Sequence, residues 1–313
     1  MTVKPLKIAV LLGGWSAERE VSLTGGAAVV EALKSLGHQV TAIDVQRDLD
    51  GLARGLLHQA GGKPHVVFNA LHGRGGEDGL IQGVLEYAGI PYTHSNVLAS
   101  AIAMDKPAAK KIMAAAGGRV PEGQVIGREE ISKNGYPFPA PFVVKPINEG
   151  SSVGVRIVRA GENSSFVTDE WVYGPEVLIE RYIPGRELTV GLMGGKALCV
   201  TEIRYKADFY DYTVKYSAGH ATHDCPANIP EKIAAECMRI AELSFKVLGC
   251  NGIGRIDLRW DETKPGLDGL YFLEMNTQPG FTPLSLVPEQ AKAMGISFAD
   301  LCQWIVEHPV VPS

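Results

Sequence analysis

Residues 252–258 read G-I-G-R-I-D-L, and a second stretch of the same kind, L-Y-F-L-E-M-N, ends at Asn276. Both stretches alternate apolar and polar residues, and a period of two is the pattern of a β-strand. The first stretch places Arg255 and Asp257 on one strand face, and the second places Glu274 on the same face as its final asparagine. If the two strands pair as a long hairpin, these polar side chains converge on a single face of one sheet.

The chemistry of this predicted hairpin is that of a metal site. Carboxylates such as Asp257 and Glu274, together with the amide oxygen of Asn276, are hard ligands that suit Mg²⁺. Magnesium usually keeps some waters and takes its remaining ligands from nucleotide phosphates. A solvated sheet face with an arginine–carboxylate pair would give the same pattern. The loop that follows, T-Q-P-G-F-T-P-L-S-L at 277–286, has backbone amides that could hold an anion.

A second motif, K-P-I-N-E-G-S-S-V-G, spans residues 145–154. A lysine at the end of one strand is followed by a glycine- and serine-rich turn and then by another strand. The amides and hydroxyls of such a turn can close over phosphates while Lys145 supplies a positive charge. The motif lacks the G-x-x-x-x-G-K-[ST] order of a Walker loop, and no helix follows it. An ordinary hairpin turn is the alternative interpretation.

Several other loops carry polar residues in less specific patterns. Residues 180–187, E-R-Y-I-P-G-R-E, form a short apolar hinge between carboxylates that could receive an adenine edge and a ribose, or could be an exposed turn. The loops 13–20 and 72–79 are glycine-rich and hold Glu18 and His72, but neither matches the dinucleotide fingerprint G-x-G-x-x-G. Residues 206–228 predict a long irregular segment with aromatic side chains, which is typical of a lid over a site.

The first hundred residues alternate strands and helices. Strands are expected at 7–12, 40–45 and 65–70, and helices up to residue 36 and over 81–88. This βαβα order predicts an α/β domain with a parallel sheet and helices on both of its faces. Ligands of such sheets bind beyond the carboxyl ends of the strands, so the loops after Leu12 and Ala70 are candidate sites.

The rest of the chain predicts more mixed, α+β lobes. Helices are expected at 106–116, 231–248 and 298–306, and strands at 142–145, 153–158, 176–183, 188–193, 252–260 and 270–276. No internal repeat or low-complexity linker separates these elements. With the α/β start of the chain, the pattern predicts three compact lobes.

Composition narrows the class of protein. The 313 residues are 45% apolar and 21% charged, which is typical of a globular protein. Glycine accounts for 36 residues, above the usual share of about 7%, and indicates many tight turns or close backbone approaches. With 30 basic and 35 acidic residues the net charge is −5, which argues against a broad nucleic-acid-binding surface.

Cysteine usage and hydropathy predict the compartment. The five cysteines are odd in number and form no C-x-x-C pair, so a disulfide framework or zinc site is not expected. The first apolar run, Ile8 to Leu12, is too short for the hydrophobic region of a signal peptide, and no run of 18 apolar residues follows. The sequence predicts a soluble, cytoplasmic protein with no nucleic-acid or membrane partner.

Taken together and in this order, the motifs resemble the D-alanine–D-alanine ligase family of the ATP-grasp superfamily. The resemblance runs from about Ile8 to Pro288. It is carried by seven stretches, which are residues 13–22, 70–79, 104–106, 145–154, 209–216, 254–257 and 274–286. It implies a three-domain ATP-grasp architecture: an N-terminal α/β domain at 1–103, a central domain at 104–187, and a C-terminal domain at 188–313 with a lid loop at 206–228.

The resemblance also implies roles for individual residues. The ATP site would be formed by Lys106, Lys145, Ser151, Ser152, Glu180, Tyr182, Ile183 and Glu187. Two Mg²⁺ ions, or Mn²⁺ in their place, would be bound by Asp257, Glu274 and Asn276. Glu18 would take the ammonium group of the first D-alanine, with His72 and Arg255 near its carboxyl group and the amide of Gly280 at the tetrahedral oxyanion. The second D-alanine would be held by Lys215, Ser285 and Leu286. Tyr216 would reach Glu18 through Ser151, and these last three residues with Arg255 form the implied catalytic group.

The implied activity is the ATP-dependent joining of two D-alanines through an acyl phosphate, for the synthesis of peptidoglycan precursors. The family further implies a homodimer. Three alternatives remain open. One is a related ligase that takes D-lactate, D-serine or another amine as second substrate, although Tyr216 argues against lactate. The second is an ATP-binding sensor or scaffold without turnover, and the third is a dehydrogenase.

Overall fold

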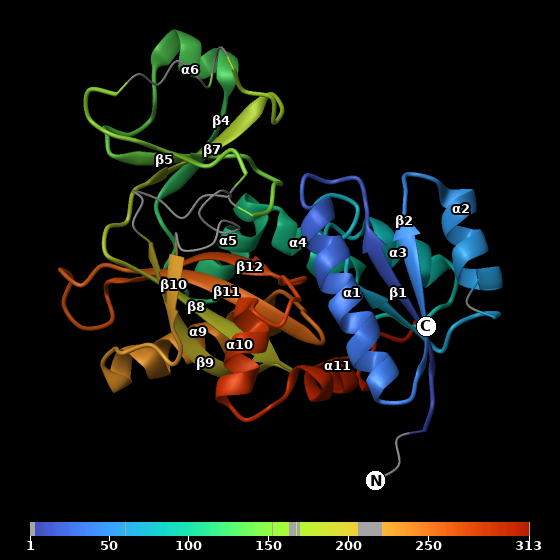
Figure 1. Cartoon of the computed structure of the whole chain (residues 1–313). Helices are drawn as coiled ribbons and strands as arrows, with labels where there is room; N and C mark the ends of the chain where they lie inside the picture. Colours follow the sequence, from blue (N-terminus) through green and yellow to red (C-terminus); the bar gives the residue numbers. More distant parts are fainter. Residues whose placement is uncertain are drawn as a thin grey trace.

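The computed structural model describes residues 4–59, 61–151, 153–162, 167, 170–205 and 221–312. These residues form three β-sheets with helices packed around them (Figure 1). A parallel sheet occupies the N-terminal part of the chain, and two antiparallel sheets follow it. No helix in the described part of the chain is long and apolar enough to cross a membrane.

The N-terminal sheet has the strand order β2-β1-β3, and both strand pairs are parallel. Its strands are β1 (Lys7–Gly13), β2 (Gln39–Val45) and β3 (Val66–Asn69). Its helices are α1 (Arg19–Ser35), α2 (Leu49–Arg54), the π-helix η1 (Gly55–Gln59) and α3 (Leu80–Tyr87). Ile8 and Val10 pack with α1, whereas Ala9 and Leu11 pack with α2, η1 and α3. The predicted parallel sheet with helices on both faces is therefore confirmed.

The second sheet has the order β4-β7-β5-β6 and is antiparallel throughout. Its elements are β4 (Gly123–Gly127), α6 (Arg128–Asn134), β5 (Phe142–Lys145), β6 (Arg156–Val158) and β7 (Glu176–Arg181). Val144 and Ile179 point into a hydrophobic core with Ile131 of α6 and Trp171. The opposite face, which carries Val143, remains available to line a cavity.

The third sheet has the order β10-β9-β8-β11-β12 and contains the predicted hairpin. Its strands are β8 (Arg186–Met193), β9 (Lys196–Tyr205), β10 (Ala221–Asp224), β11 (Ile253–Trp260) and β12 (Leu270–Asn276). The helices α4 (Val97–Met104), α5 (Lys106–Ala115) and α9 (Glu231–Val247) pack against it. The helix α10 (Leu286–Ala293) contacts β8 and β9, and α11 (Phe298–Glu307) returns to α1. Val310 then pairs with Tyr92 beside the N-terminal sheet, which places the C-terminus there (Figure 1).

Several predicted boundaries differ from the structure, most of them by one or two residues, and three differences lie beside candidate site residues. The strand expected from Val153 begins at Arg156, because Val153 N–H donates to the Gly150 carbonyl at 3.0 Å and closes a turn instead. The strand expected to reach Ile183 ends at Arg181. Within the predicted irregular segment 206–228, Ala221–Asp224 form the edge strand β10, paired with β9. Residues 206–220 of that segment lie outside the described part of the chain.

Candidate active site

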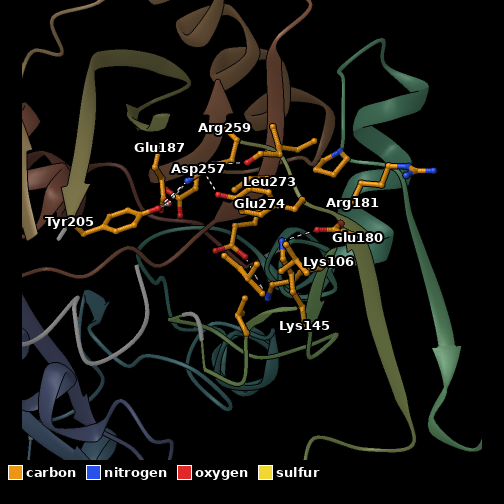
Figure 2. A pocket seen from close by; sticks show the side chains of 16 residues that line it. Lys106, Lys145, Glu180, Arg181, Glu187, Tyr205, Asp257, Arg259, Leu273 and Glu274 are labelled. Carbon is orange, nitrogen blue, oxygen red and sulfur yellow. Dashed lines mark hydrogen bonds and ion pairs between the residues drawn. The ribbon is translucent and has the colours of Figure 1, made fainter. Parts of the chain in front are cut away.

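A cavity that is open to solvent lies between the second and third sheets (Figure 2). Apolar walls come from Val143 and Ile157, which are neighbours in the β5–β6 register, and from Leu273 on the facing sheet. The charged and polar lining residues are Lys106, Lys145, Glu180, Arg181, Tyr182, Glu187, Tyr205, Asp257, Arg259 and Glu274. Such a cavity suits a flat ring that carries an anionic group.

An irregularity in β12 explains how both an apolar and an acidic side chain reach the cavity. Asp257 pairs with Glu274 and Leu258 pairs with Phe272, so Leu273 is an extra residue on its strand. A bulge of this kind re-aims the side chains on either side of it. Leu273 and Glu274 therefore both line the cavity although they are consecutive in the chain.

One carboxylate and two lysines form a buried cluster at one side of the cavity. Glu180 on β7 is 1% exposed and pairs with Lys145 Nζ at 2.7 Å and with Lys110 Nζ. Burial alone would raise the pKa of Glu180, but the two ammonium groups lower it to about 2. Burial lowers the pKa of Lys110 to about 8, against the opposing effect of Glu180. Lys110 lies one helical turn after Lys106 on α5, and sequence reasoning missed it because the pattern there is that of an ordinary lysine-rich helix.

A second ion pair includes Glu187, the residue predicted to bind ribose. Arg259 Nη1 lies 3.3 Å from Glu187 Oε2, in keeping with their opposite positions in the β8–β11 register. The hydroxyl of Tyr205 donates to the same carboxylate oxygen at 3.1 Å. Sequence reasoning missed Arg259, yet it continues the alternation of Arg255 and Asp257 on β11, and that alternation is the signal that could have found it.

The three predicted metal ligands come together as the hairpin register requires. Arg255 pairs with Asn276 and Asp257 with Glu274 across the two strands. The Arg255 guanidinium donates to both oxygens of Asp257, at 2.9 and 2.8 Å. Thr189 Oγ1 also donates to Asp257 Oδ1 at 2.8 Å.

The donor chemistry of these three residues fits Mg²⁺. Two carboxylates and an amide oxygen are the hard oxygen ligands that this ion prefers. The two carboxylates, Asp257 and Glu274, line the cavity, where a bound phosphate would supply further oxygen ligands. Glu274 Oε2 is 3.5 Å from Lys106 Nζ, so a cation of the chain already balances part of this charge. Within the described residues, no group of three or more His, Cys, Asp or Glu side chains could hold a metal by itself.

Glu18 and Ser151 meet across two parts of the chain that are far apart in sequence. Glu18 precedes α1 and is 6% exposed, and its Oε1 accepts a hydrogen bond from Ser151 Oγ. Ser151 has a φ of 48°, which residues other than glycine rarely adopt. On the same loop, the Glu149 carbonyl accepts from Lys106 Nζ at 2.5 Å. The glycine- and serine-rich loop therefore connects the start of α1 to the cavity.

His72 and Glu77 extend this region along the loop after β3. His72 is 4% exposed, and burial lowers its pKa although Glu18 acts in the opposite direction. Glu77 is 7% exposed, and its carboxylate accepts from the Gly73 amide at 3.1 Å. Burial, followed by the charge of Glu18, raises the pKa of Glu77 well above its usual value. Sequence reasoning gave Glu77 no role, although an acid inside a glycine-rich loop at a sheet edge is a recognisable signal.

The loop between β12 and α10 is held by its own contacts. Ser285 begins α10, and its Oγ accepts from the Thr282 amide at 2.9 Å. A Cβ added to Gly280 would lie 3.3 Å from Ser285 Oγ, so the two predicted residues are neighbours. Phe281 between them is fully buried against Phe68, which anchors the loop to the N-terminal sheet. Leu286 packs beside Ile203 of β9.

Three predicted site residues lie outside the described part of the chain. They are Ser152 in the glycine- and serine-rich loop, and Lys215 and Tyr216 in the predicted lid. Their predicted roles stay predictions. Of the remaining predicted residues, Glu18 and Ser151 meet each other, and those that line the cavity are Lys106, Lys145, Glu180, Tyr182, Ile183, Glu187, Asp257 and Glu274.

Comparison with known proteins adds independent findings. A family model described as "D-ala D-ala ligase C-terminus" matches residues 110–307, and one described as "D-ala D-ala ligase N-terminus" matches residues 53–95. The chain is 50% identical to a D-alanine–D-alanine ligase from Rhizorhabdus wittichii over 97% of this chain and 96% of that protein. It is 51% identical to the ligase of the same name from Gluconobacter oxydans, over 97% and 99% of the two chains.

Solved structures give the same picture. D-alanine–D-alanine ligase from Bacillus anthracis, complexed with ATP, has a TM-score of 0.79 and 32% identity, with 98% of this chain and 97% of that chain covered. VanG D-Ala:D-Ser ligase from Enterococcus faecalis also has a TM-score of 0.79, at 29% identity, with 97% and 99% covered.

Proposed function

Because this chain belongs to the D-alanine–D-alanine ligase family, we propose that the cavity and the Glu18 region together carry out the ATP-dependent joining of two D-alanines. One observation supports the proposal above all others. The cavity between the two antiparallel sheets has Lys106 and Lys145 beside it together with Asp257 and Glu274. A nucleotide triphosphate needs this combination of cations and of oxygen ligands for a metal.

The chemistry begins with a carboxylate that is a poor electrophile, because its leaving group would be an oxide ion. Transfer of the γ-phosphoryl group of ATP to the carboxylate of the first D-alanine gives an acyl phosphate and ADP. The free amine of the second D-alanine then attacks the acyl carbon, and inorganic phosphate leaves. The protein's contribution is mainly positioning and charge neutralisation, since phosphoryl transfer requires little covalent chemistry from side chains.

The nucleotide half of the site divides into a phosphate end and a base end. Lys106 and Lys145 neutralise phosphate oxygens, with the amides and hydroxyls of the 150–154 loop, Ser151 and Ser152 among them, closing over the same group. Glu180, Tyr182 and Ile183 hold adenine, and Glu187 accepts hydrogen bonds from the ribose. The apolar walls at Val143, Ile157 and Leu273 support this assignment, because they bracket a space in which a base ring would lie.

Asp257, Glu274 and Asn276 would hold Mg²⁺, for which their oxygen donors fit, as two ions or with Mn²⁺ in their place. When bound, the metal supplies positive charge to the phosphate oxygens and holds the triphosphate in one orientation. The chain's own contribution at this point is Arg255. It donates to both oxygens of Asp257, so it fixes the orientation of that carboxylate.

The amino-acid half of the site surrounds Glu18. Its carboxylate pairs with the ammonium group of the first D-alanine, and Ser151 holds that carboxylate in place. His72 and Arg255 lie near the D-alanine carboxyl group, and Arg255 with the amide of Gly280 stabilises the tetrahedral oxyanion. Lys215, Ser285 and Leu286 receive the second D-alanine, and Tyr216 joins the Ser151–Glu18 pair. Exclusion of water by the predicted lid is needed because acyl phosphates hydrolyse.

Phosphate release tests this function directly. The purified protein is incubated with ATP, Mg²⁺ and D-alanine, and phosphate and the dipeptide are measured; L-alanine serves as the control. We expect release with D-alanine and none with L-alanine. Absence of D-alanine-dependent phosphate release would contradict the proposed function, whatever the affinity for ATP.

The second substrate is tested in the same assay, because the structure is equally similar to a ligase named for D-serine. D-serine and D-lactate are offered as second substrates beside D-alanine, and the products are separated by mass. We expect D-alanyl-D-alanine to be the main product. If the main product instead contains D-serine or D-lactate, that compound and not D-alanine is the second substrate.

Three wider assignments complete the proposal. We place the enzyme in the cytoplasm, where it would supply D-alanyl-D-alanine to peptidoglycan precursors, and we assign it a homodimer. We also divide the chain into domains at 1–103, 104–187 and 188–313. Sedimentation of the purified protein measures the mass in solution, and a monomer at micromolar concentration would contradict the dimer.

A further inference from the structure

Arg259 lies on β11, lines the nucleotide cavity and is only 8% exposed. Four residues are proposed to hold the base and the ribose, and the Arg259 guanidinium contacts all of them except Glu180. Nε donates to the Ile183 carbonyl oxygen at 3.2 Å, Nη1 to Glu187 Oε2 at 3.3 Å, and Nη2 to the Tyr182 hydroxyl at 3.4 Å. Nη1 also donates to the Tyr205 hydroxyl at 3.0 Å. One side chain therefore joins the hinge after β7 to the carboxylate on β8.

These contacts require the shape of an arginine. The guanidinium has five N–H donors in a fixed planar fork, so it can bond acceptors in several directions at once. It also lies over the Tyr182 ring, with the guanidinium carbon 5.8 Å from the ring centroid. A lysine has a single nitrogen and could not reach the Ile183 carbonyl, Glu187 and Tyr182 together. The burial of Arg259 and Glu187 limits competition from water for this pair.

We propose that Arg259 is a positioning residue that sets the preference of this ligase for a ribonucleotide. It holds the Glu187 carboxylate toward the ribose hydroxyls and fixes the peptide at Ile183 that meets the adenine edge. This inference rests on the proposed nucleotide site. It goes beyond that site because Arg259 acts through Glu187 and the hinge, with no contact of its own to the ribose required.

The physical consequence is a loss of discrimination as well as a loss of affinity. A carboxylate that accepts hydrogen bonds from the Arg259 guanidinium and the Tyr205 hydroxyl is held in one orientation. Without the guanidinium, Glu187 keeps its charge but loses the hydrogen bond and ion pair to Arg259, so its orientation toward the ribose is less fixed. In such a variant, the kcat/KM for an ATP analogue that lacks the 2′-hydroxyl should lie close to the kcat/KM for ATP. A merely structural role for Arg259 would lower the amount of folded enzyme without changing this ratio.

The test compares kcat/KM for ATP and for 2′-deoxy-ATP in the full-length enzyme and four variants. The variants are Arg259→Gln, Arg259→Lys, Glu187→Gln and the matched control Arg186→Gln. Arg186 also lies in the third sheet and pairs with a carboxylate, that of Glu202 at 2.5 Å, but it does not line the cavity. KM for D-alanine and thermal stability are measured in parallel.

We expect Arg259→Gln to raise KM for ATP about tenfold or more, as the loss of a charge-assisted bond predicts. The preference for ATP over 2′-deoxy-ATP should fall to the level of Glu187→Gln, while KM for D-alanine stays within about twofold. Arg259→Lys should be intermediate, and it carries the test if the glutamine variant does not fold. Arg186→Gln should keep the wild-type preference.

The outcomes separate the inference from the function on which it rests. If Glu187→Gln loses the preference but both Arg259 variants keep it, the inference about Arg259 is wrong and the nucleotide site stands. If neither the wild type nor Glu187→Gln distinguishes the two nucleotides, the ribose assignment of Glu187 fails, and the Arg259 inference fails with it. A change in KM for D-alanine equal to that for ATP would make Arg259 a general structural residue and would also overturn the inference.

Discussion

Glu180 and Glu77 are almost equally buried, at 1% and 7% exposure, but the pKa values of their carboxyl groups are shifted in opposite directions. At the nucleotide cavity, Glu180 is surrounded by Lys110 and Lys145, and these lower its pKa to about 2. In the Glu18 region, Glu77 is surrounded by further acids, and burial with the charge of Glu18 raises its pKa well above 4.5. Burial alone would raise both values, so the neighbouring charges decide the sign.

The difference follows from what each region is proposed to bind. The cavity gathers cations because a triphosphate is anionic, and a buried carboxylate there helps to hold the lysines. The Glu18 region gathers acids because an ammonium group is cationic, and the crowding of these acids raises the pKa of Glu77.

The largest expected effect comes from Glu274, which both regions share. It is 3.5 Å from Lys106, and its charge raises the pKa values of Lys145 and of Glu77. We expect Glu274→Ala to lower kcat about a thousandfold, because it removes a proposed metal ligand and an electrostatic contact to the phosphate end. The steady-state rate of phosphate release measures it. The control is Glu262→Ala, an exposed acid near Arg186, and equal rates in the two variants would contradict the role of Glu274.

The second effect is on stability and tests the cation-rich side of the comparison. Glu180→Gln leaves two buried lysines without their carboxylate, and breaking a buried pair in this way typically costs about 3–5 kcal/mol. Because the folded pKa of about 2 is below the usual 4.5, the contribution of Glu180 is complete above pH 4.5 and is lost as pH falls toward 2.

Urea denaturation of Glu180→Gln and wild type, from pH 7 down to pH 3, measures this dependence. The difference in unfolding free energy should be largest at pH 7 and should shrink below pH 4.5. The companion variant Lys110→Met keeps the Glu180–Lys145 pair and should cost less. A difference that does not change with pH would mean that Glu180 contributes by packing and not by charge.

Much of this site could be predicted from sequence because its strands alternate cleanly. The pattern at 252–258 and 270–276 was enough to predict the hairpin and the shared face of Asp257 and Glu274, and the register confirms both. The βαβα order of the first hundred residues predicted the parallel sheet in the same way. In these segments, most of the apolar residues that the alternating strand pattern predicts to be buried are also residues that the folded protein buries.

The residues that sequence reasoning missed act through tertiary partners. Lys110 becomes distinctive only because α5 packs on the third sheet and brings its ammonium group to Glu180, 70 positions away. Arg259 owes its contacts to a strand register and to a hinge 76 positions earlier. Charge in a sequence does not report burial or partners, so these two residues read there as ordinary surface charges.

The third prediction separates the two regions by their kinetic constants. Glu18→Gln keeps an oxygen acceptor for Ser151 and removes only the charge that would pair with the ammonium group. We expect KM for the first D-alanine to rise about 10- to 100-fold, since bonds to charged groups contribute about 1.5–3 kcal/mol. KM for ATP should be unchanged, and Glu187→Gln should give the reverse result. Initial rates, measured with one substrate varied at a time, give the two KM values. If Glu18→Gln raises KM for ATP as much as KM for D-alanine, the proposed division into a nucleotide region and an amino-acid region is wrong.

The smallest effect is expected at Glu77, and it tests the acid-rich side. Where the folded protein keeps Glu77 protonated, a glutamine replaces it with nearly the same shape, still accepts from Gly73 and still offers a donor. Well below pH 4.5, Glu77 is protonated in both the folded and the unfolded chain, so Glu77→Gln and wild type should agree within about 0.5 kcal/mol in unfolding free energy.

Above pH 4.5 the two proteins should diverge in a direction opposite to that of Glu180→Gln. The unfolded wild-type chain ionises Glu77 near its ordinary value of 4.5, whereas the folded chain holds the proton to a higher pH. Wild type therefore loses stability as pH rises toward the folded pKa, and Glu77→Gln does not. Urea denaturation from pH 4.5 to 8 measures the difference, with the exposed acid Glu31→Gln as the control that should not change with pH. If Glu77→Gln is instead increasingly destabilised as pH rises, Glu77 is ionised in the fold, and the contrast with Glu180 is wrong.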